Sequence, residues 1–211
     1  MLKPAAFLLF ALALNAAAQT KPVFENNFEA AKLGELSEDF LVLDGGFAVK
    51  EESGNKFLEL PGAPLETFGV LFGPTEPSGI AVSARFHSTG KGRRFPTFGV
   101  GLNGVGGYRL LVTPAKKAVE LFRGDHVIAT VPYDWPSDKW VFVRLQVRKL
   151  KSGAWKVEGK AWTQGETEPA KWMISADDKE ELAAGRPSIW GLPFAGTPIR
   201  FDDLTVTAAK D

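Results

Sequence analysis

Residues 139–172 read KWVFVRLQVRKLKSGAWKVEGKAWTQGETEPAKW, and this stretch decides the fold. In its first part every second residue is apolar, namely Val141, Val143, Leu145 and Val147. The segment Lys151–Gly153 then has turn-forming residues, and the alternation resumes at Val157. Alternation with period 2 is typical of a strand with one buried face. The stretch therefore predicts a β-hairpin whose apolar side packs against a second sheet.

Similar short patterns continue along the chain on both sides of this hairpin. Three further segments alternate in the same way: 80–87, 97–103 and 108–113. Turn signals such as Asp44-Gly45-Gly46 separate neighbouring apolar segments. Only 175–184, SADDKEELAA, has helical character, with Ser175 as a cap and Gly185 as a stop. About a dozen short strands with one short helix predict an all-β sandwich of two antiparallel sheets.

The N-terminus has the features of a secretory signal peptide. Lys3 precedes an apolar run, Pro4–Leu14, that is too short to span a bilayer, and the small residues Ala16–Ala18 predict cleavage before Gln19. An N-terminal membrane anchor is the alternative, although no cysteine follows the run to hold a lipid. We therefore expect residues 1–18 to be removed and residues 19–211 to form a single domain.

Charge and cysteine content limit the possible partners. The 25 Lys and Arg residues balance the 25 Asp and Glu residues, so nothing favours a nucleic acid or an anionic membrane. The absence of cysteine fits a bacterial periplasm or exterior better than a eukaryotic secreted module. We expect a periplasmic or secreted monomer that does not insert into a membrane once its signal peptide is removed.

The C-terminal part of the sequence resembles a known superfamily. Residues 185–206, GRPSIWGLPFAGTPIRFDDLTV, resemble the end of concanavalin A-like lectins and glucanases, especially laminin-G-like domains of exported bacterial proteins. Those domains commonly end in a strand of the type aromatic-Asp-Asp-apolar-x-Val, as in Phe201–Val206 here. Trp140–Val147 and the pattern Glu168-Pro169-x-x-Trp172 extend the resemblance over nearly the whole mature chain. The resemblance implies a jelly roll with a concave sheet face, but it does not define an activity.

The sequence lacks the usual signs of catalysis. Glycan hydrolysis requires a pair of carboxyl groups around the sugar bond, and glucanases of this superfamily carry them as Glu-x-Asp-x-Glu. No such run is present, and Glu158 has no carboxylate neighbour on its predicted strand. His87 and His126 accompany no G-x-S-x-G motif, and they give no zinc-ligand spacing. A non-catalytic binding module is therefore favoured, while a glycan-modifying hydrolase and a purely structural or partner-binding jelly roll stay open.

Polar and aromatic side chains on the outer side of the predicted strands form the candidate ligand site. Proteins bind glycans with an aromatic platform and forked polar groups. If the strands share one sheet, the site consists of Arg85, His87, Arg109, Arg144, Gln146 and Trp162. In this hypothesis a glycan or cell-surface polysaccharide stacks on Trp162 and hydrogen-bonds to Arg144 or Gln146. The alternative is an ordinary solvated sheet face, on which such residues are common.

Other tryptophans and glycines give weaker predictions. Trp140 and Trp190 flank strands and are expected in core or edge packing, whereas we expect Trp135, Trp155 and Trp172 in loops or turns that could be exposed. Gly99 and Gly101 interrupt a strand, which often marks the close approach of a ligand or another backbone.

The resemblance also implies a structural calcium ion, which many of these jelly rolls hold between their first and last strands. Asp202 alternates with Leu204 and Val206, so it is expected to point inward, where a carboxylate needs compensation. The predicted metal ligands are Asp202, Glu25, Asn26 and the carbonyl of Gly45. The alternative is an Asp202 that bonds to loop N–H groups or to Arg200.

Overall fold

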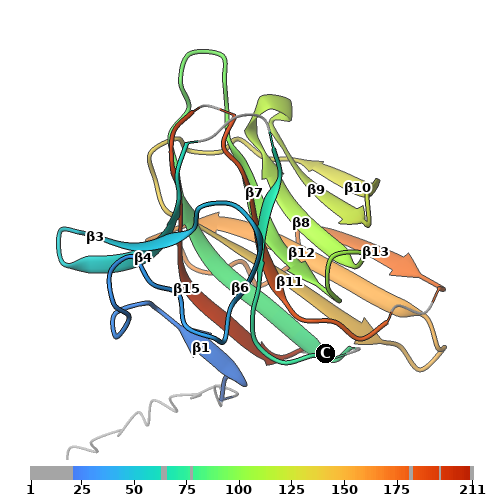
Figure 1. Ribbon diagram of the computed structural model, residues 1–211. Helices are drawn as coiled ribbons and strands as arrows, with labels where there is room; N and C mark the ends of the chain where they lie inside the picture. Colours follow the sequence, from blue (N-terminus) through green and yellow to red (C-terminus); the bar gives the residue numbers. More distant parts are fainter. Residues whose placement is uncertain (1–20, 63–65, 77, 181–182, 195, 210–211) are drawn as a thin grey trace, which may run out of the picture.

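Two antiparallel β-sheets pack face to face in the computed structural model (Figure 1). The structure describes residues 21–62, 66–76, 78–180, 183–194 and 196–209. The predicted signal peptide and its cleavage site before Gln19 lie outside these residues, so both stay predictions. Within the described residues the predicted all-β sandwich is confirmed, because the only helical element is a 3₁₀ turn at Pro114–Lys116.

Sheet A has eight strands in the order β13-β12-β11-β6-β15-β4-β3, with β1 paired to β15. The strands are β1 (Phe24–Asn26), β3 (Ala48–Glu52), β4 (Asn55–Leu60), β6 (Ile80–His87), β11 (Val141–Lys149), β12 (Trp155–Thr163), β13 (Ile174–Asp178) and β15 (Ile199–Ala208). The predicted hairpin in 139–172 is confirmed as β11 and β12, which pair in register from Val141↔Thr163 to Lys149↔Trp155.

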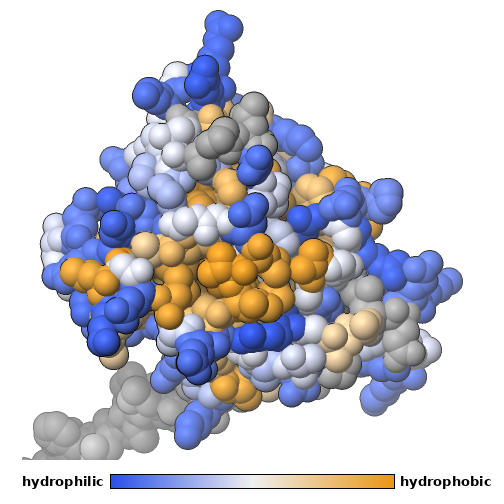
Figure 2. Space-filling model, in the orientation of Figure 1, coloured by the Kyte–Doolittle hydropathy of each residue, from blue (hydrophilic) through white to orange (hydrophobic). Residues whose placement is uncertain are grey.

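Sheet B has seven strands in the order β10-β9-β8-β7-β14-β5-β2. The strands are β2 (Leu41–Asp44), β5 (Phe68–Leu71), β7 (Thr97–Leu102), β8 (Tyr108–Thr113), β9 (Ala118–Arg123), β10 (His126–Pro132) and β14 (Ser188–Leu192). The edge strand β2 exposes all of its side chains, including Leu41, Val42 and Leu43. Figure 2 shows hydrophobic side chains gathered in the middle of the face turned toward the viewer.

The core lies between the two sheets and follows from the alternation in the sequence. Val143 and Leu145 of sheet A are fully buried, as is Leu110 of sheet B. The rings of Phe86 and Phe98 stack across the interface with centroids 5.1 Å apart. The residues between these apolar positions consequently lie on the outer faces of the sheets.

Three sequence-based expectations about local structure are wrong. The predicted helix over 175–184 is a strand at its start, because β13 pairs with β12 at the edge of sheet A. Its charged residues favoured a helix, but Ile174 is buried, and pairing with β12 outweighs the local preference. Trp135 and Trp155 are buried rather than exposed.

No helix within the described ranges is long and apolar enough to cross a membrane.

Candidate functional site

The predicted ligand residues divide between the two sheets. Five of them lie on the outer face of sheet A: Arg85, His87, Arg144, Gln146 and Trp162. Arg109 lies on β8 in sheet B, on the other side of the sandwich. The expectation that all six residues share one surface is therefore wrong for Arg109.

Trp162, the predicted platform for a sugar ring, is already packed by the protein. Its ring stacks on that of Phe142 with centroids 5.2 Å apart and an interplanar angle of 12°. Only 9% of the residue is exposed. Nearby, Gln146 is buried and donates from Nε2 to Oε2 of Glu158 at 2.8 Å. These two residues therefore offer little free surface to a ligand.

The loop that follows β12 occupies the charged groups in the middle of this face. Lys160 donates to the carbonyl oxygen of Pro169 at 2.7 Å and forms an ion pair with Glu168 at 2.8 Å. Its ammonium also lies 4.5 Å from the ring centroid of Trp172. Arg144 pairs with the same carboxylate of Glu168 at 3.4 Å. Arg144 and Lys160 thus hold the loop in place.

Asp202 also lies on the outer face, so its predicted inward orientation is wrong. The pairing of β15 with β6 shifts between Asp202 and Thr205, where Asp203 adopts a positive φ of 49°. This bulge turns Leu204 into the core and leaves Asp202 opposite Arg85. An extra residue in one strand reverses the side-chain alternation beyond it, which simple counting along the sequence misses.

The buried carboxylate of Asp202 is compensated by protein groups. Nη2 of Arg85 lies 2.5 Å from Oδ2 of Asp202, and Nδ2 of Asn55 donates to the same oxygen at 3.0 Å. Burial raises the pKa of Asp202, while the hydrogen bond from Asn55 and the charge of Arg85 lower it. The expected alternative partner, Arg200, instead pairs with Glu52 and Glu59.

Two of the predicted calcium ligands have other contacts within the protein. Asn26 accepts the backbone N–H of Phe28 through Oδ1 at 2.8 Å, and Gly45 lies against the rings of Phe47 and Phe68. In the part of the chain that the structure describes, no group of three or more His, Cys, Asp or Glu residues is placed to hold a metal ion. Calcium binding at Asp202 therefore stays a prediction without support from this geometry.

A hollow of about 370 Å³ opens on the outer face of sheet A beside His87. We call it the His87 hollow. Its lining includes one aromatic residue and four ionisable residues: Trp140, Glu52, His87, Asp138 and Arg200. They come from β3, β6, β15 and the segment just before β11, which pairing within sheet A brings to one end of the face. Of the predicted ligand residues, the hollow includes only His87.

One ion pair and one contact of a neutral imidazole with a carboxylate set the charge of the hollow. Arg200 makes a forked contact with both carboxylate oxygens of Glu52, at 2.5 and 3.0 Å. This contact lowers the pKa of Glu52 and raises that of Arg200. His87 Nε2 lies 3.3 Å from Oδ1 of Asp138, but burial and the charge of Arg200 lower the pKa of His87. At pH 7 the imidazole is therefore neutral and can accept or donate a hydrogen bond.

Trp140 is the aromatic wall of the hollow. The Arg85 guanidinium lies 4.6 Å from its ring centroid, and the His87 ring lies 5.3 Å from it. The residue is half-buried rather than enclosed. Its place beside a predicted strand favoured core or edge packing. Its even-numbered position, in phase with Phe142 and Arg144, was the signal that could have placed it on the outer face.

The outer face of sheet B is filled by its own side chains. The ring of Trp190 lies 2.9 Å from where a Cβ on Gly69 would stand, and its Nε1 lies 3.0 Å from the same point on Gly101. The Arg109 guanidinium covers Trp190 at 4.9 Å from the ring centroid and donates to the carbonyl of Gly124. At Gly101 the nearest neighbours are therefore side chains, with Oγ of Ser188 closer than Trp190, whereas at Gly99 the nearest neighbour is the backbone carbonyl of Leu110, as the sequence predicted.

Comparisons with known proteins support the fold alone. No family model and no curated protein matches the sequence. The structure is similar to the carbohydrate-binding module CBM66 from Bacillus subtilis, with a TM-score of 0.56, 13% identity and coverage of 81% of this chain and 96% of that one. It is also similar to a Bacillus subtilis protein of unknown function with a galectin-like fold, with a TM-score of 0.62, 14% identity and coverage of 90% and 98%.

A third similar structure is the carbohydrate recognition domain of Emp47p, with a TM-score of 0.56, 10% identity and coverage of 92% of this chain and 99% of that domain. The three structures share the two-sheet sandwich with this chain over most of their lengths. The chain therefore has the concanavalin A-like β-sandwich fold that the sequence predicted, a fold that the comparison also describes as galectin-like.

Proposed function

We propose that this protein is an exported, non-catalytic carbohydrate-binding module whose ligand site is the His87 hollow. The observation that carries the proposal is the combination of a half-buried indole, Trp140, with ionisable groups in a hollow of about 370 Å³. Sugar rings present C–H faces to an indole and hydroxyls to forked polar groups. The hollow offers both, whereas the surface around Trp162 is already packed.

The polar groups of the hollow suit hydroxyl groups. The Glu52 carboxylate and the exposed Asp138 carboxylate can accept hydrogen bonds, and Arg200 can donate them. Neutral His87 can do either. Two carboxylates and one guanidinium line the hollow, so these groups together carry a net negative charge. We therefore expect neutral sugars to bind better than sulfated sugars or uronic acids.

A hydrolase on this face is the second candidate, because the hollow contains two carboxylates. Glycosidases need one carboxyl group that stays protonated, with a raised pKa, to act as the acid. The hydrogen bond from Arg200 lowers the pKa of Glu52, which makes it a poor acid. The pKa of Asp202 is raised, but its side chain is 1% exposed and lies against Arg85, out of reach of a substrate. These observations favour binding over hydrolysis.

The test is a glycan array probed with the purified protein, followed by titration of the strongest neutral glycan into variants. Asp138→Asn should weaken binding about two- to fivefold, the usual range for an exposed polar contact. Trp140→Ala should weaken it at least tenfold if the indole is the platform. Glu51→Gln, beside Glu52 on β3 but outside the lining of the hollow, is the matched control.

The same titrations distinguish the two surfaces on sheet A. Trp162→Ala should leave affinity nearly unchanged, because Trp162 does not line the His87 hollow. Loss of binding in Trp162→Ala together with full binding in Asp138→Asn and Trp140→Ala would overturn the proposed site in favour of the original Trp162 hypothesis. Turnover of a glycan by the wild-type protein would favour the hydrolase.

A further inference from the structure

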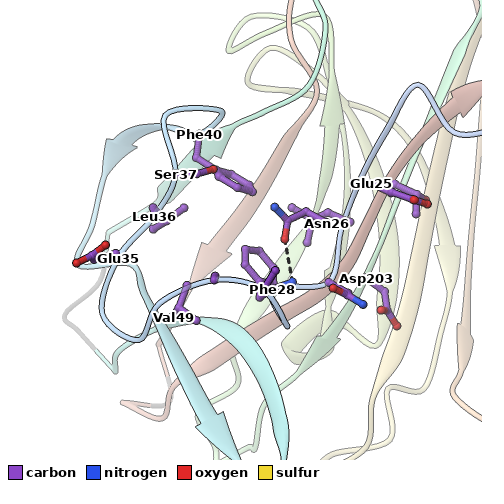
Figure 3. A pocket seen from close by; sticks show the side chains of 14 residues that line it. Glu25, Asn26, Phe28, Glu35, Leu36, Ser37, Phe40, Val49 and Asp203 are labelled. Atoms are coloured by element: carbon purple, nitrogen blue, oxygen red, sulfur yellow. Dashed lines mark hydrogen bonds between the residues drawn. The ribbon is translucent and has the colours of Figure 1, made fainter.

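A second pocket, of about 650 Å³, lies under the connection between β1 and β2 (Figure 3). We call it the Phe28 pocket. It is bordered by β1, by the connecting segment 27–40 and by the bulge of β15 at Asp203–Thr205. None of the residues that line it belongs to the lining of the His87 hollow. The two sites can therefore be occupied and altered separately.

The walls of the Phe28 pocket are apolar. Phe28 and Phe40 stack with ring centroids 5.7 Å apart, and Leu36 and Val49 complete this side. Phe28 has a positive φ of 60°, which is uncommon for a bulky residue, and its N–H is held by Oδ1 of Asn26. Phe28 is only 2% exposed and Val49 is fully buried, so the half-buried Phe40 and Leu36 supply the apolar surface that a ligand can reach.

The connection that covers the pocket is anchored to sheet A. The N–H of Gly34 donates to the carbonyl oxygen of Val49 at 2.9 Å. The ammonium of Lys56 donates to the carbonyl oxygens of Glu29 and Ala31 at 3.1 and 2.9 Å. The connection is thus fixed to β3 and β4 of sheet A.

The charged residues that line the pocket are all acidic: Glu25, Glu35 and Asp203. Figure 3 shows Glu35 toward one end and Glu25 and Asp203 toward the other, with the two phenylalanine rings between them. Asp203 pairs with Nε of Arg85 at 2.9 Å, and Glu35 pairs with Lys32 at 3.7 Å in a well-exposed contact. Glu25 has no hydrogen-bond or ion-pair partner among the residues that the structure describes.

We propose that the Phe28 pocket binds a small organic cation with an apolar body and an ammonium group. Aromatic rings attract ammonium ions through their negative faces, and carboxylates supply the opposite charge. No Lys, Arg or His lines the pocket, and Glu25 has no cation beside it among the described residues, so an anion is disfavoured there. This pocket has none of the guanidinium and imidazole groups with which the His87 hollow could bind a sugar. The combination of the Phe40 ring with acidic residues, among them Glu25, which is unpaired within the described residues, selects the amine.

Isothermal titration calorimetry with 2-phenylethylamine tests this assignment. Two ligands of the same shape serve as controls: neutral 2-phenylethanol and anionic 3-phenylpropionate. The amine should bind at millimolar or lower concentration, the alcohol more weakly, and the acid not at all. Equal binding of all three would overturn the proposal, because it would show that charge plays no part, and absence of amine binding would overturn it as well.

Variants locate the binding and separate it from the glycan site. Glu25→Gln and Glu35→Gln should each weaken amine binding about two- to fivefold, as expected for exposed ion pairs. Glu38→Gln changes an exposed acid of the same connection that does not line the pocket, and it should have no effect. Asp138→Asn in the His87 hollow should have none either. Equal losses in Glu38→Gln and Glu25→Gln would overturn the site.

Addition of calcium chloride alone tests whether the acidic residues bind a metal ion instead. If the acidic residues formed a metal site, calcium would raise the melting temperature in the absence of any amine and a chelator would reverse the change. If the wild-type protein shows this response, Glu25→Gln does not, and no amine binds, then the ligand is a metal ion and not an amine. Failure of glycan binding at the His87 hollow would leave the amine result unaffected.

Discussion

His87 shows how one side chain connects the candidate site to stability. Burial, together with the charge of Arg200, lowers its pKa below the ordinary value of 6.5, although Asp138 and Glu52 oppose this shift. The unfolded chain therefore binds a proton on this residue more readily than the native protein does. Stability from this group is full above pH 6.5 and is lost as the pH falls toward the lowered native pKa.

We predict that replacing His87 removes this pH dependence. In denaturant titrations between pH 7.5 and pH 5, His87→Gln should lose less unfolding free energy on acidification than the wild-type protein does. At pH 7.5 the two proteins should differ only by the change in packing around Trp140. Parallel pH profiles for the two proteins would show that His87 is not a buried neutral group.

The limits of prediction from sequence at the residue scale are visible in two tryptophans. Alternation along β12 correctly placed Trp162 on the outer face of sheet A. It could not show that the residue is buried there, because that depends on the cross-strand stack with Phe142. Trp140 lies in the same phase of β11, but it precedes the strand, and its place beside His87 depends on the pairing of β11 with β6.

At the scale of elements, the hairpin of β11 and β12 places two positive charges opposite each other, and the loop that follows β12 neutralises them. Arg144 lies directly opposite Lys160, and like charges in this position destabilise a sheet. Glu168 lies between them and pairs with both, at 3.4 and 2.8 Å. Pairing within the hairpin was predictable from alternation, whereas the return of the following loop over its face was not.

We predict that Glu168→Gln destabilises the protein by about 1 kcal/mol, a modest value because Glu168 is partly exposed. The double variant Glu168→Gln with Lys160→Met should recover part of this loss, because it removes one of the two facing cations. A thermodynamic cycle in urea measures the coupling between the two sites. If the two effects simply add, Glu168 does not act by neutralising Lys160.

At the scale of the whole molecule, alternation predicted most of the residues that face the core, apart from the bulge at Asp202, but not which strands share a sheet. β6 pairs with β11 and β15 in sheet A, whereas β7, the next strand in sequence, pairs with β8 and β14 in sheet B. That change of sheet sends Arg109 to the opposite side from Arg85. Long-range pairing of this kind depends on contacts between distant segments, about which local patterns contain no information.

A few large side chains that meet between the two sheets contribute to the stability of the sandwich. Phe86 of sheet A is fully buried and contacts both Phe98 of sheet B, at 5.1 Å, and Phe201 of β15, at 5.5 Å. Phe86→Ala should lower the unfolding free energy by about 3–5 kcal/mol, because it removes buried surface and leaves a cavity between rigid sheets.

Phe122→Ala is the matched control for this change, because Phe122 is a half-buried phenylalanine on β9 in the outer face of sheet B. It should cost less than Phe86→Ala, since part of its ring is already in water. Urea unfolding measures both values. Equal losses in the two variants would mean that the stack of Phe86 on Phe98 is no more important than surface packing, and that the sandwich is held together elsewhere in its core.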